Sequence, residues 1–315
     1  MQMVVFDDGE FEISLVTYCR PDFISYILEK TYHEAVARNI KFIIRDSSPD
    51  DSTEKVVKNF NEKNHSNVEY YRVDSSINPG YKPVLGIQNS ESKYVWTGCD
   101  SFYFDYKELD EKVFPYIKQN IDFIVFYNMK DIRNGVYTDK TEFIHELFVP
   151  ITCFGASIYK TDIFSYYRND PEEHQRVESL YSNCYGNAVL AYYLDAFARN
   201  TDYRASYSYV NTISVEKGIQ KRKVQAWAKR FYECWVFELL YILDSLPDCY
   251  RDKEKVLDET WETMKLDSWD FCYRASRGDL NKETFDIISG GGYFTQTYKT
   301  QRKDTILRMR TSVVC

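Results

Sequence analysis

The chain has 315 residues, 44% of them hydrophobic and 28% charged, and its formal net charge is -8. This length and composition are typical of one large or two modest globular domains and exclude a disordered chain. The acidic excess argues against a general nucleic-acid-binding surface, so no nucleic acid is expected as a partner. The eight cysteines include no CxxC pair and no zinc-like cluster with histidine.

The first residues, MQMVVFDDGEFE, have neither the basic nor the apolar region of a secretion signal. The longest apolar runs, such as Phe123–Tyr127, are far shorter than the roughly 20 residues that span a bilayer. We therefore expect a cytoplasmic protein with reduced thiols.

Buried strands alternate with helices in the first hundred residues: strands 11–18, 39–45, 68–73 and 94–98, and helices 22–37, 52–60 and 81–89. This order predicts a parallel sheet with helices on both faces. Ligands bind such sheets at the carboxyl ends of the strands, near a topological switch point. We therefore expect four loops to form one site: residues 17–22, 46–52, 78–82 and 98–102.

Further strands are predicted at residues 122–127 and 152–159. From about residue 177 onward the pattern favours helices, with amphipathic helices at 225–246 and 253–264. These patterns predict a sheet domain over residues 1–210 and a helical region over residues 211–315, with a soft boundary near 205–220.

Polar motifs follow the first, second and fourth predicted strands, and a further motif opens the third helix. In chain order they are Thr17-Tyr18-Cys19-Arg20, Arg45-Asp46-Ser47-Ser48, Asn78-Pro79-Gly80 and Cys99-Asp100-Ser101. Their order and spacing resemble those of the family 2 glycosyltransferases, inverting enzymes of the GT-A fold, over roughly residues 11–165. The resemblance implies a Rossmann-like α/β domain with a mostly parallel sheet flanked by helices, followed here by a helical C-terminal region.

The resemblance also implies a hexosyltransferase-type activity. A sugar would pass from a nucleotide donor, first of all a UDP-sugar, to a hydroxyl of a glycan. The family setting implies bacterial surface polysaccharide or glycoprotein glycan assembly, with a lipid-linked or protein-linked acceptor. A homo-oligomer is compatible with the sequence.

By this resemblance, Thr17, Tyr18 and Arg20 hold the nucleotide, with Tyr18 near the base and Arg20 near a phosphate. Asp46, beside Ser48, accepts a hydrogen bond from the uracil N–H or a ribose hydroxyl. The alternative for the first group is a plain strand-to-helix turn. The alternative for Asp46 is a helix cap or an Asx-turn.

Gly80 and Lys82 open the third predicted helix. Backbone N–H groups and the helix dipole favour a phosphate there, and Lys82 adds positive charge. The alternative is a loop in which Gly80 supplies a positive φ angle.

Asp100 stands where the family has an Asp-x-Asp motif, so the metal site is reduced to one carboxylate. The resemblance implies a divalent cation, Mn²⁺ or Mg²⁺, held by Asp100 with Ser101 and offsetting charge on the departing UDP. Lys82 and Arg20 can partly replace the ion, which makes it weak or dispensable. The alternative is that Asp100 belongs to an ordinary turn.

An inverting transfer needs a base near the acceptor hydroxyl. The family's Glu-Asp pair has no clear counterpart, and the candidates are Glu172, Glu173, His174 and Glu178. Glu178, closest to the following helix, is the predicted catalytic base, and the alternative is a solvated acidic loop. The segment Phe154–Ser157 resembles the acceptor side of the family, or is a strand with a bulge.

The segment Lys217–Arg230 is basic and precedes an apolar run. Such a helix can lie on an anionic membrane surface, which suits a lipid-linked acceptor, or it can be a core helix with a solvated start. Two other functions are weighed against the transferase. A nucleotidyltransferase lacks support because no Gly-rich signature with Arg and Lys lies near the N-terminus. A catalytically weak partner that binds nucleotide or glycan for another transferase stays open.

Overall fold

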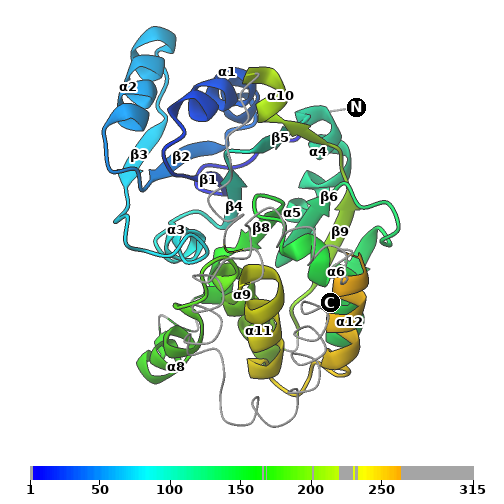
Figure 1. Cartoon of the computed structure of the whole chain (residues 1–315). Coiled ribbons are helices and arrows are strands. Elements are labelled where there is room, and N and C mark those ends of the chain that lie inside the picture. Colours follow the sequence, from blue (N-terminus) through cyan, green and yellow to red (C-terminus); the bar gives the residue numbers. More distant parts are fainter. Residues whose placement is uncertain are drawn as a thin grey trace, which may run out of the picture.

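The computed structural model describes residues 3–164, 167, 169–200, 202–219, 230 and 233–263. Its main sheet has eight strands: β1 Phe11–Thr17, β2 Lys41–Asp46, β3 Glu69–Arg72, β4 Tyr94–Cys99, β6 Phe123–Tyr127, β7 Gly135–Tyr137, β8 Ser157–Lys160 and β9 Ala205–Tyr209. They lie in the order β3-β2-β1-β4-β8-β6-β9-β7 (Figure 1).

Strands β3, β2, β1 and β4 are parallel neighbours, and β6 is parallel to β9. Strand β8 runs antiparallel to both β4 and β6, and β7 runs antiparallel to β9. All the other strands therefore point the same way. The predicted α/β fold with a mostly parallel sheet is confirmed, as are the predicted strands in residues 11–127.

The predicted strand at 152–159 is wrong over most of its length. Residues Lys140–Ile151 form helix α6, a turn follows, and β8 begins only at Ser157. The apolar residues of α6 recur at helical spacing, whereas Gly155 has a φ of +97°, which no extended strand adopts.

The prediction of a mostly helical chain after residue 177 missed two strands. Strand β9 pairs with β6, and β10, Thr212–Ser214, pairs antiparallel with β5, Phe102–Phe104. Just beyond β10, the Val215 N–H donates a hydrogen bond to the Ser101 carbonyl. The domain boundary at residue 210 stays a prediction. Strand β10, which lies beyond that boundary, packs back onto the first part of the chain.

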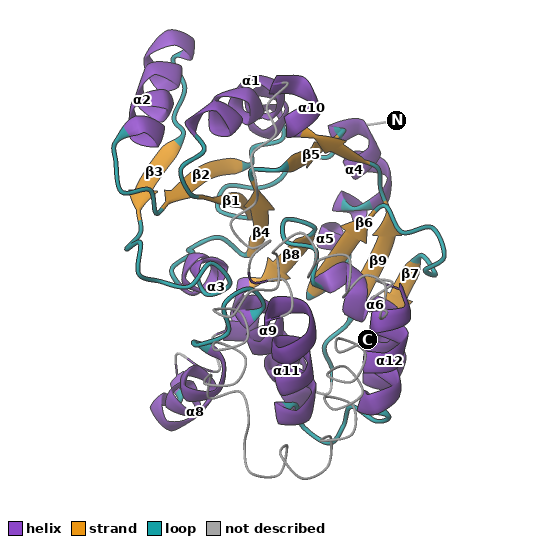
Figure 2. Cartoon of the chain, in the orientation of Figure 1, coloured by secondary structure: helices purple, strands orange, loops and turns teal. Residues whose placement is uncertain are grey.

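Helices cover both faces of the sheet (Figure 2). One hydrophobic core contains residues of α1 Pro21–Ala37, α2 Ser52–Asn64, α4 Tyr106–Lys112, α5 Phe114–Lys118 and α10 Val215–Ile219. The other contains residues of α3 Lys82–Gln88, α6, α8 Pro171–Tyr181, α9 Ala188–Arg199, α11 Leu239–Ser245 and α12 Lys253–Thr263. Strand residues alternate between the two cores, and each buried side chain contributes about 1.5–3 kcal/mol.

The predicted helix at 225–246 is only partly within the described residues. Residues Glu233–Glu238 form one π-helical stretch that continues into α11. Most of the basic segment Lys217–Arg230 lies outside the described residues. Within the described part of the chain, no helix has the length and apolar character needed to cross a membrane.

Candidate functional site

The site is located by the strand order. The chain places β2 and β3 on one side of β1, and then crosses to place β4 on the other side. The carboxyl ends of β1 and β4 therefore flank a topological switch point, where open α/β sheets bind ligands. The loops after β1, β2 and β4 and the start of α3 supply the polar groups described next.

Asp100 follows β4 directly and is 7% exposed. Its Oδ2 accepts a hydrogen bond from the Thr17 hydroxyl at 2.8 Å, and its Oδ1 accepts one from Arg20 Nη1 at 2.7 Å. The same Nη1 donates to the Ser101 hydroxyl at 2.9 Å. Four predicted site residues from two neighbouring strand ends thus form one hydrogen-bonded cluster.

The backbone before helix α1 and the Phe23 ring also fix the position of Arg20. Cys19, with a φ of +53°, turns the chain after β1, and Arg20 then becomes the N-cap residue of α1, with Pro21 at its first position. The guanidinium carbon lies 4.8 Å from the centre of the buried Phe23 ring. The Arg20 side chain is 15% exposed. Its Nε and Nη2 donors have no hydrogen-bond partner among the described residues.

Lys82, the first residue of α3, is a buried cation. It is only 6% exposed, and its ammonium donates to the Ser47 hydroxyl and lies 5.5 Å from the centre of the Tyr18 ring. Among the described residues no carboxylate lies within ion-pair distance of it. Burial lowers the pKa of Lys82, and the more distant Asp46 carboxylate offsets only part of this effect.

A buried ammonium without a counter-ion is costly in an apoprotein. Such a group at the carboxyl ends of the strands is typical of a residue that binds an anionic ligand. Tyr18, beside it, has an aromatic ring and is 48% exposed. A flat, anionic molecule is therefore the kind of ligand that this edge accommodates.

Asp46 ends β2 and is fully buried. Its Oδ1 accepts from the Ser48 N–H at 2.9 Å and from the Ser48 hydroxyl, and its Oδ2 accepts from the Tyr70 hydroxyl at 3.0 Å. The Ser48 hydroxyl in turn accepts from the Cys19 N–H at 2.7 Å. Asp46 and Ser48 thus tie the loop after β2 to the loop after β1. Their predicted contacts with a nucleotide stay predictions.

Gly80 contacts another loop rather than open space. Its N–H donates to the Tyr185 carbonyl at 2.7 Å, and its carbonyl accepts from the Val189 N–H. A Cβ at this position would lie 2.5 Å from the backbone carbon of Gly186. Its φ angle is not positive, so close backbone approach, rather than the predicted positive φ of the alternative, requires glycine here. The predicted phosphate contact is untested.

Glu238 is not among the site residues predicted from the sequence. This fully buried carboxylate accepts hydrogen bonds from the backbone N–H groups of Tyr185, Gly186 and Asn187 and so closes the N-terminus of α9. One signal in the sequence points to it. Glu238 is a single charge inside the apolar run from Cys234 to Leu243.

Helix α8 carries the predicted base, Glu178. The predicted alternative of an acidic loop is wrong, because residues Pro171–Tyr181 are helical. Glu178 is 47% exposed. It accepts a hydrogen bond, 3.4 Å long, from the hydroxyl of Tyr81, the residue that follows Gly80. It makes no described contact with Asp100 or its partners. Its role as base therefore stays a prediction.

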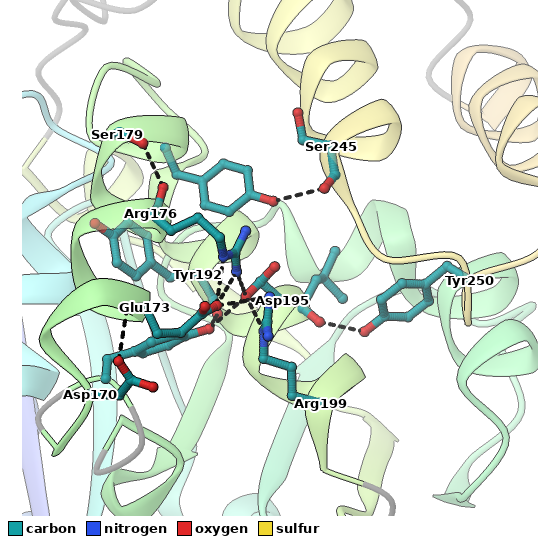
Figure 3. Close-up of polar contacts among 12 residues, drawn as sticks. Asp170, Glu173, Arg176, Ser179, Tyr192, Asp195, Arg199, Ser245 and Tyr250 are labelled. Atoms are coloured by element: carbon teal, nitrogen blue, oxygen red, sulfur yellow. Dashed lines mark hydrogen bonds and ion pairs between the residues drawn. The ribbon is translucent and has the colours of Figure 1, made fainter.

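Ion pairs fix α8 against α9. The buried carboxylate of Asp195 on α9 binds Arg176 on α8 at 2.7 Å and Arg199 at 3.0 Å (Figure 3). The carboxylate of Glu173 binds both arginines as well. Glu173 is therefore part of a structural network, which argues against it as the base among the candidates.

The predicted acceptor-side segment adjoins the site. The Gly155 carbonyl accepts from Trp96 Nε1 at 2.8 Å, and a Cβ on Gly155 would lie 2.7 Å from Cys99 Sγ. Behind this segment, a cavity of about 10 Å³ is lined in part by Ser157 and Asn187. This space is about the size of one water molecule, and the buried Ser157 hydroxyl has no hydrogen-bond partner among the described residues.

The cluster around Asp100 does not match the donor set of a divalent cation. Both carboxylate oxygens already accept hydrogen bonds, one of them from a guanidinium. Nowhere in the described ranges do three or more His, Cys, Asp or Glu side chains gather closely enough to hold a metal. Mg²⁺ and Mn²⁺ need oxygen ligands that are open to them.

The chain matches no protein-family model and no curated protein sequence. Solved structures are similar. S. aureus TarS 1-349 in complex with UDP is 13% identical, with a TM-score of 0.52 over 97% of this chain and 88% of that one. Mannosyltransferase PcManGT from Pyrobaculum calidifontis, in complex with GDP-Man and Mn²⁺, is 12% identical, with a TM-score of 0.50 over 100% of this chain and 88% of that one.

Glucosyl-3-phosphoglycerate synthase from Mycobacterium tuberculosis, in complex with Mn²⁺ and UDP-glucose, is 13% identical, with a TM-score of 0.50 over 76% of this chain and 80% of that one. A longer S. aureus TarS chain is covered over only 42% of its length. At these identities the likeness establishes the fold, which is the GT-A type of α/β fold.

Proposed function

We propose that this protein is a glycosyltransferase that moves a sugar from a nucleotide donor to a hydroxyl of a glycan. The observation that carries the proposal is the buried Lys82 ammonium, which lies near the exposed ring of Tyr18 and has no carboxylate partner among the described residues. At the same strand ends, Arg20 keeps two N–H donors without a partner in the described part of the chain. A nucleoside diphosphate supplies a flat base and a diphosphate to match them. A UDP-sugar is the first donor to test.

Each group then has a role. Tyr18 stacks on the base, while Lys82 and Arg20 bind the diphosphate and stabilise it as it leaves. Thr17, Asp46 and Ser48 hold the two loops in register, and inversion needs a base, for which we propose Glu178. The setting proposed is bacterial surface polysaccharide or glycoprotein glycan assembly, with a lipid-linked or protein-linked acceptor.

Titration calorimetry with UDP and with GDP tests this function, each in buffer with EDTA and in buffer with Mn²⁺. We expect the wild type to bind at least one nucleotide, and Lys82→Met to weaken binding about 10- to 100-fold. Arg133→Gln is the matched control, because Arg133 is an exposed arginine paired with Glu142. A wild type that binds neither nucleotide in either buffer would contradict the proposal.

A second candidate is a nucleotide-binding partner of another transferase, without transfer activity of its own. One observation favours it, namely that Glu178 makes no described contact with the Asp100 cluster. Release of UDP from a UDP-sugar separates the two candidates. If Glu178 is the base, Glu178→Gln lowers that rate about 100-fold or more while nucleotide binding persists. Glu62→Gln, at an exposed position of α2, serves as the control.

A further inference from the structure

Asp100 is paired with a cation that belongs to the protein. The Arg20–Asp100 contact is 2.7 Å long, and both side chains are largely buried, at 15% and 10% exposure. Thr17 occupies the second oxygen of the carboxylate. A divalent ion at Oδ1 would displace the guanidinium and leave it without its carboxylate, and an ion at Oδ2 would compete with the Thr17 hydroxyl. A buried charge that loses its partner is strongly destabilising.

Arg20 is also oriented for a ligand. Its Nη1 donates hydrogen bonds to Asp100 and Ser101, and the guanidinium lies over the Phe23 ring. The Nε and Nη2 groups have no protein partner in the part of the chain that the structure describes. A planar guanidinium with free N–H donors suits two oxygens of a phosphate, and a fixed side chain loses little entropy on binding.

We propose that Arg20, oriented by Asp100 and assisted by Lys82, binds the diphosphate of the donor in place of a divalent cation. This inference rests on the proposed function. In the transfer step, the bond between the anomeric carbon and the diphosphate oxygen breaks, and its electron pair leaves with the diphosphate. The acceptor oxygen forms the new bond and gives its proton to a base. Arg20 and Lys82 face the negative charge that develops on the leaving group.

In this arrangement Asp100 is a positioning residue, and it acts through Arg20. Two consequences follow. Nucleotide binding does not depend on Mn²⁺, and the effect of removing the Asp100 charge depends on the presence of Arg20. A metal-ligand role for Asp100 has the opposite consequences, because the effect of the carboxylate then depends on Mn²⁺ and not on Arg20.

The first test needs no variant. Calorimetry of the wild type with UDP and GDP is run in EDTA and in Mn²⁺, and we expect dissociation constants within about threefold of each other. Affinity at least about tenfold tighter in Mn²⁺ overturns the inference but leaves the proposed function standing. Absence of binding in both buffers defeats the proposed function, and the inference with it.

The second test is a double-mutant cycle with Arg20→Gln, Asp100→Asn and the double variant. We expect Arg20→Gln to weaken binding about 10- to 100-fold in both buffers. Asp100→Asn should weaken it less, equally in both buffers, and should add nothing when Arg20 is already replaced. An Asp100→Asn effect that appears only in Mn²⁺, or that persists in the double variant, overturns the inference. Circular dichroism melting confirms that each variant is folded, and Arg133→Gln is the control.

Discussion

Glu238 closes the N-terminus of helix α9 at Asn187, 51 residues away in the sequence. Its Oε2 accepts from the backbone N–H of Asn187 at 3.1 Å and from the Asn187 side chain at 3.0 Å. The Asn187 side chain does not cap its own helix, and Glu238, from another element, accepts from the N–H of this N-cap residue. The same loop holds Gly80 through the Tyr185 carbonyl, which links the helix around Glu238 to the start of α3.

Replacement of Glu238 by Gln therefore acts on both stability and binding. The amide keeps the shape but loses the charge and places an NH₂ group against backbone donors. We expect the free energy of unfolding to fall by about 3 kcal/mol and nucleotide affinity to fall with it. Urea titration and calorimetry measure the two effects. Asp258→Asn, an exposed position on α12, is the control. Unchanged stability would mean that the cap contributes nothing.

Gly80→Ala tests the close approach of two backbones. The new Cβ would lie 2.5 Å from the Gly186 carbonyl carbon, and backbone atoms cannot give way as a flexible side chain does. We expect a loss of about 1–3 kcal/mol in stability. Gly98→Ala is the matched control, since its Cβ would find no atom nearer than 3.4 Å. Equal thermal shifts for the two variants would count against the packing argument.

Lys82→Met separates stability from binding. The substitution removes a buried ammonium that has no carboxylate partner in the described part of the chain, so we expect the unliganded protein to be as stable as the wild type or more stable. Nucleotide affinity should fall about 10- to 100-fold. Urea titration and calorimetry on the same samples measure both. A variant that loses stability and keeps its affinity would show that Lys82 is a structural residue.

The lowered pKa of Lys82 also sets a pH dependence. Because burial lowers the pKa in the folded state, the unfolded chain holds the Lys82 proton over the range between the two pKa values. The contribution of Lys82 to stability therefore becomes more favourable as pH rises through that range. Binding behaves in the opposite way, since a diphosphate favours the ammonium, and affinity should fall as pH rises through the lowered pKa. Lys82→Arg should remove this fall, and a fall of equal size in that variant would assign it to another group.

The Asp100 cluster could be predicted because its members lie at the ends of two long buried strands or within three residues of those ends. Thr17 ends FEISLVT and Asp100 follows YVWTGC, so parallel pairing alone brings the two together. The pairing of Arg20 with Asp100 could not be predicted. The order of the strands places residues at the same end of the sheet, but it does not determine which side chains there form ion pairs or hydrogen bonds with each other.

Other features depend on contacts far apart in the chain. Strand β9, ASYSY, has Ala205 and two tyrosines on one face and two serines on the other, which is a short pattern to recognise in a sequence. Its place in the sheet depends on pairing with β6, some eighty residues earlier, and with β7. Helix α6 contains Pro150 near its end, which obscured the helical spacing before it. The structural role of Glu238 depends on its hydrogen bonds at the N-terminus of α9, which lies far from it in the sequence.

Cys19 offers a chemical test of where the nucleotide lies. It is exposed, and its thiol lies close enough to Tyr18 to raise the pKa of the Tyr18 hydroxyl. Burial raises the pKa of Cys99 and of Cys153 to about 12, which leaves both as unreactive thiols near neutral pH. The exposed Cys249 provides an internal control within the same molecule.

We expect UDP or GDP to slow alkylation of Cys19 by iodoacetamide, because a nucleotide stacked on Tyr18 covers the neighbouring thiol. At a nucleotide concentration ten times the dissociation constant, the rate should fall about tenfold. Alkylation of Cys249 should not change. Peptide mass spectrometry over a time course measures the two sites separately. Calorimetry confirms that the nucleotide is bound under these conditions. If Cys19 is then alkylated at the same rate with and without it, the nucleotide binds away from the β1–β4 switch point.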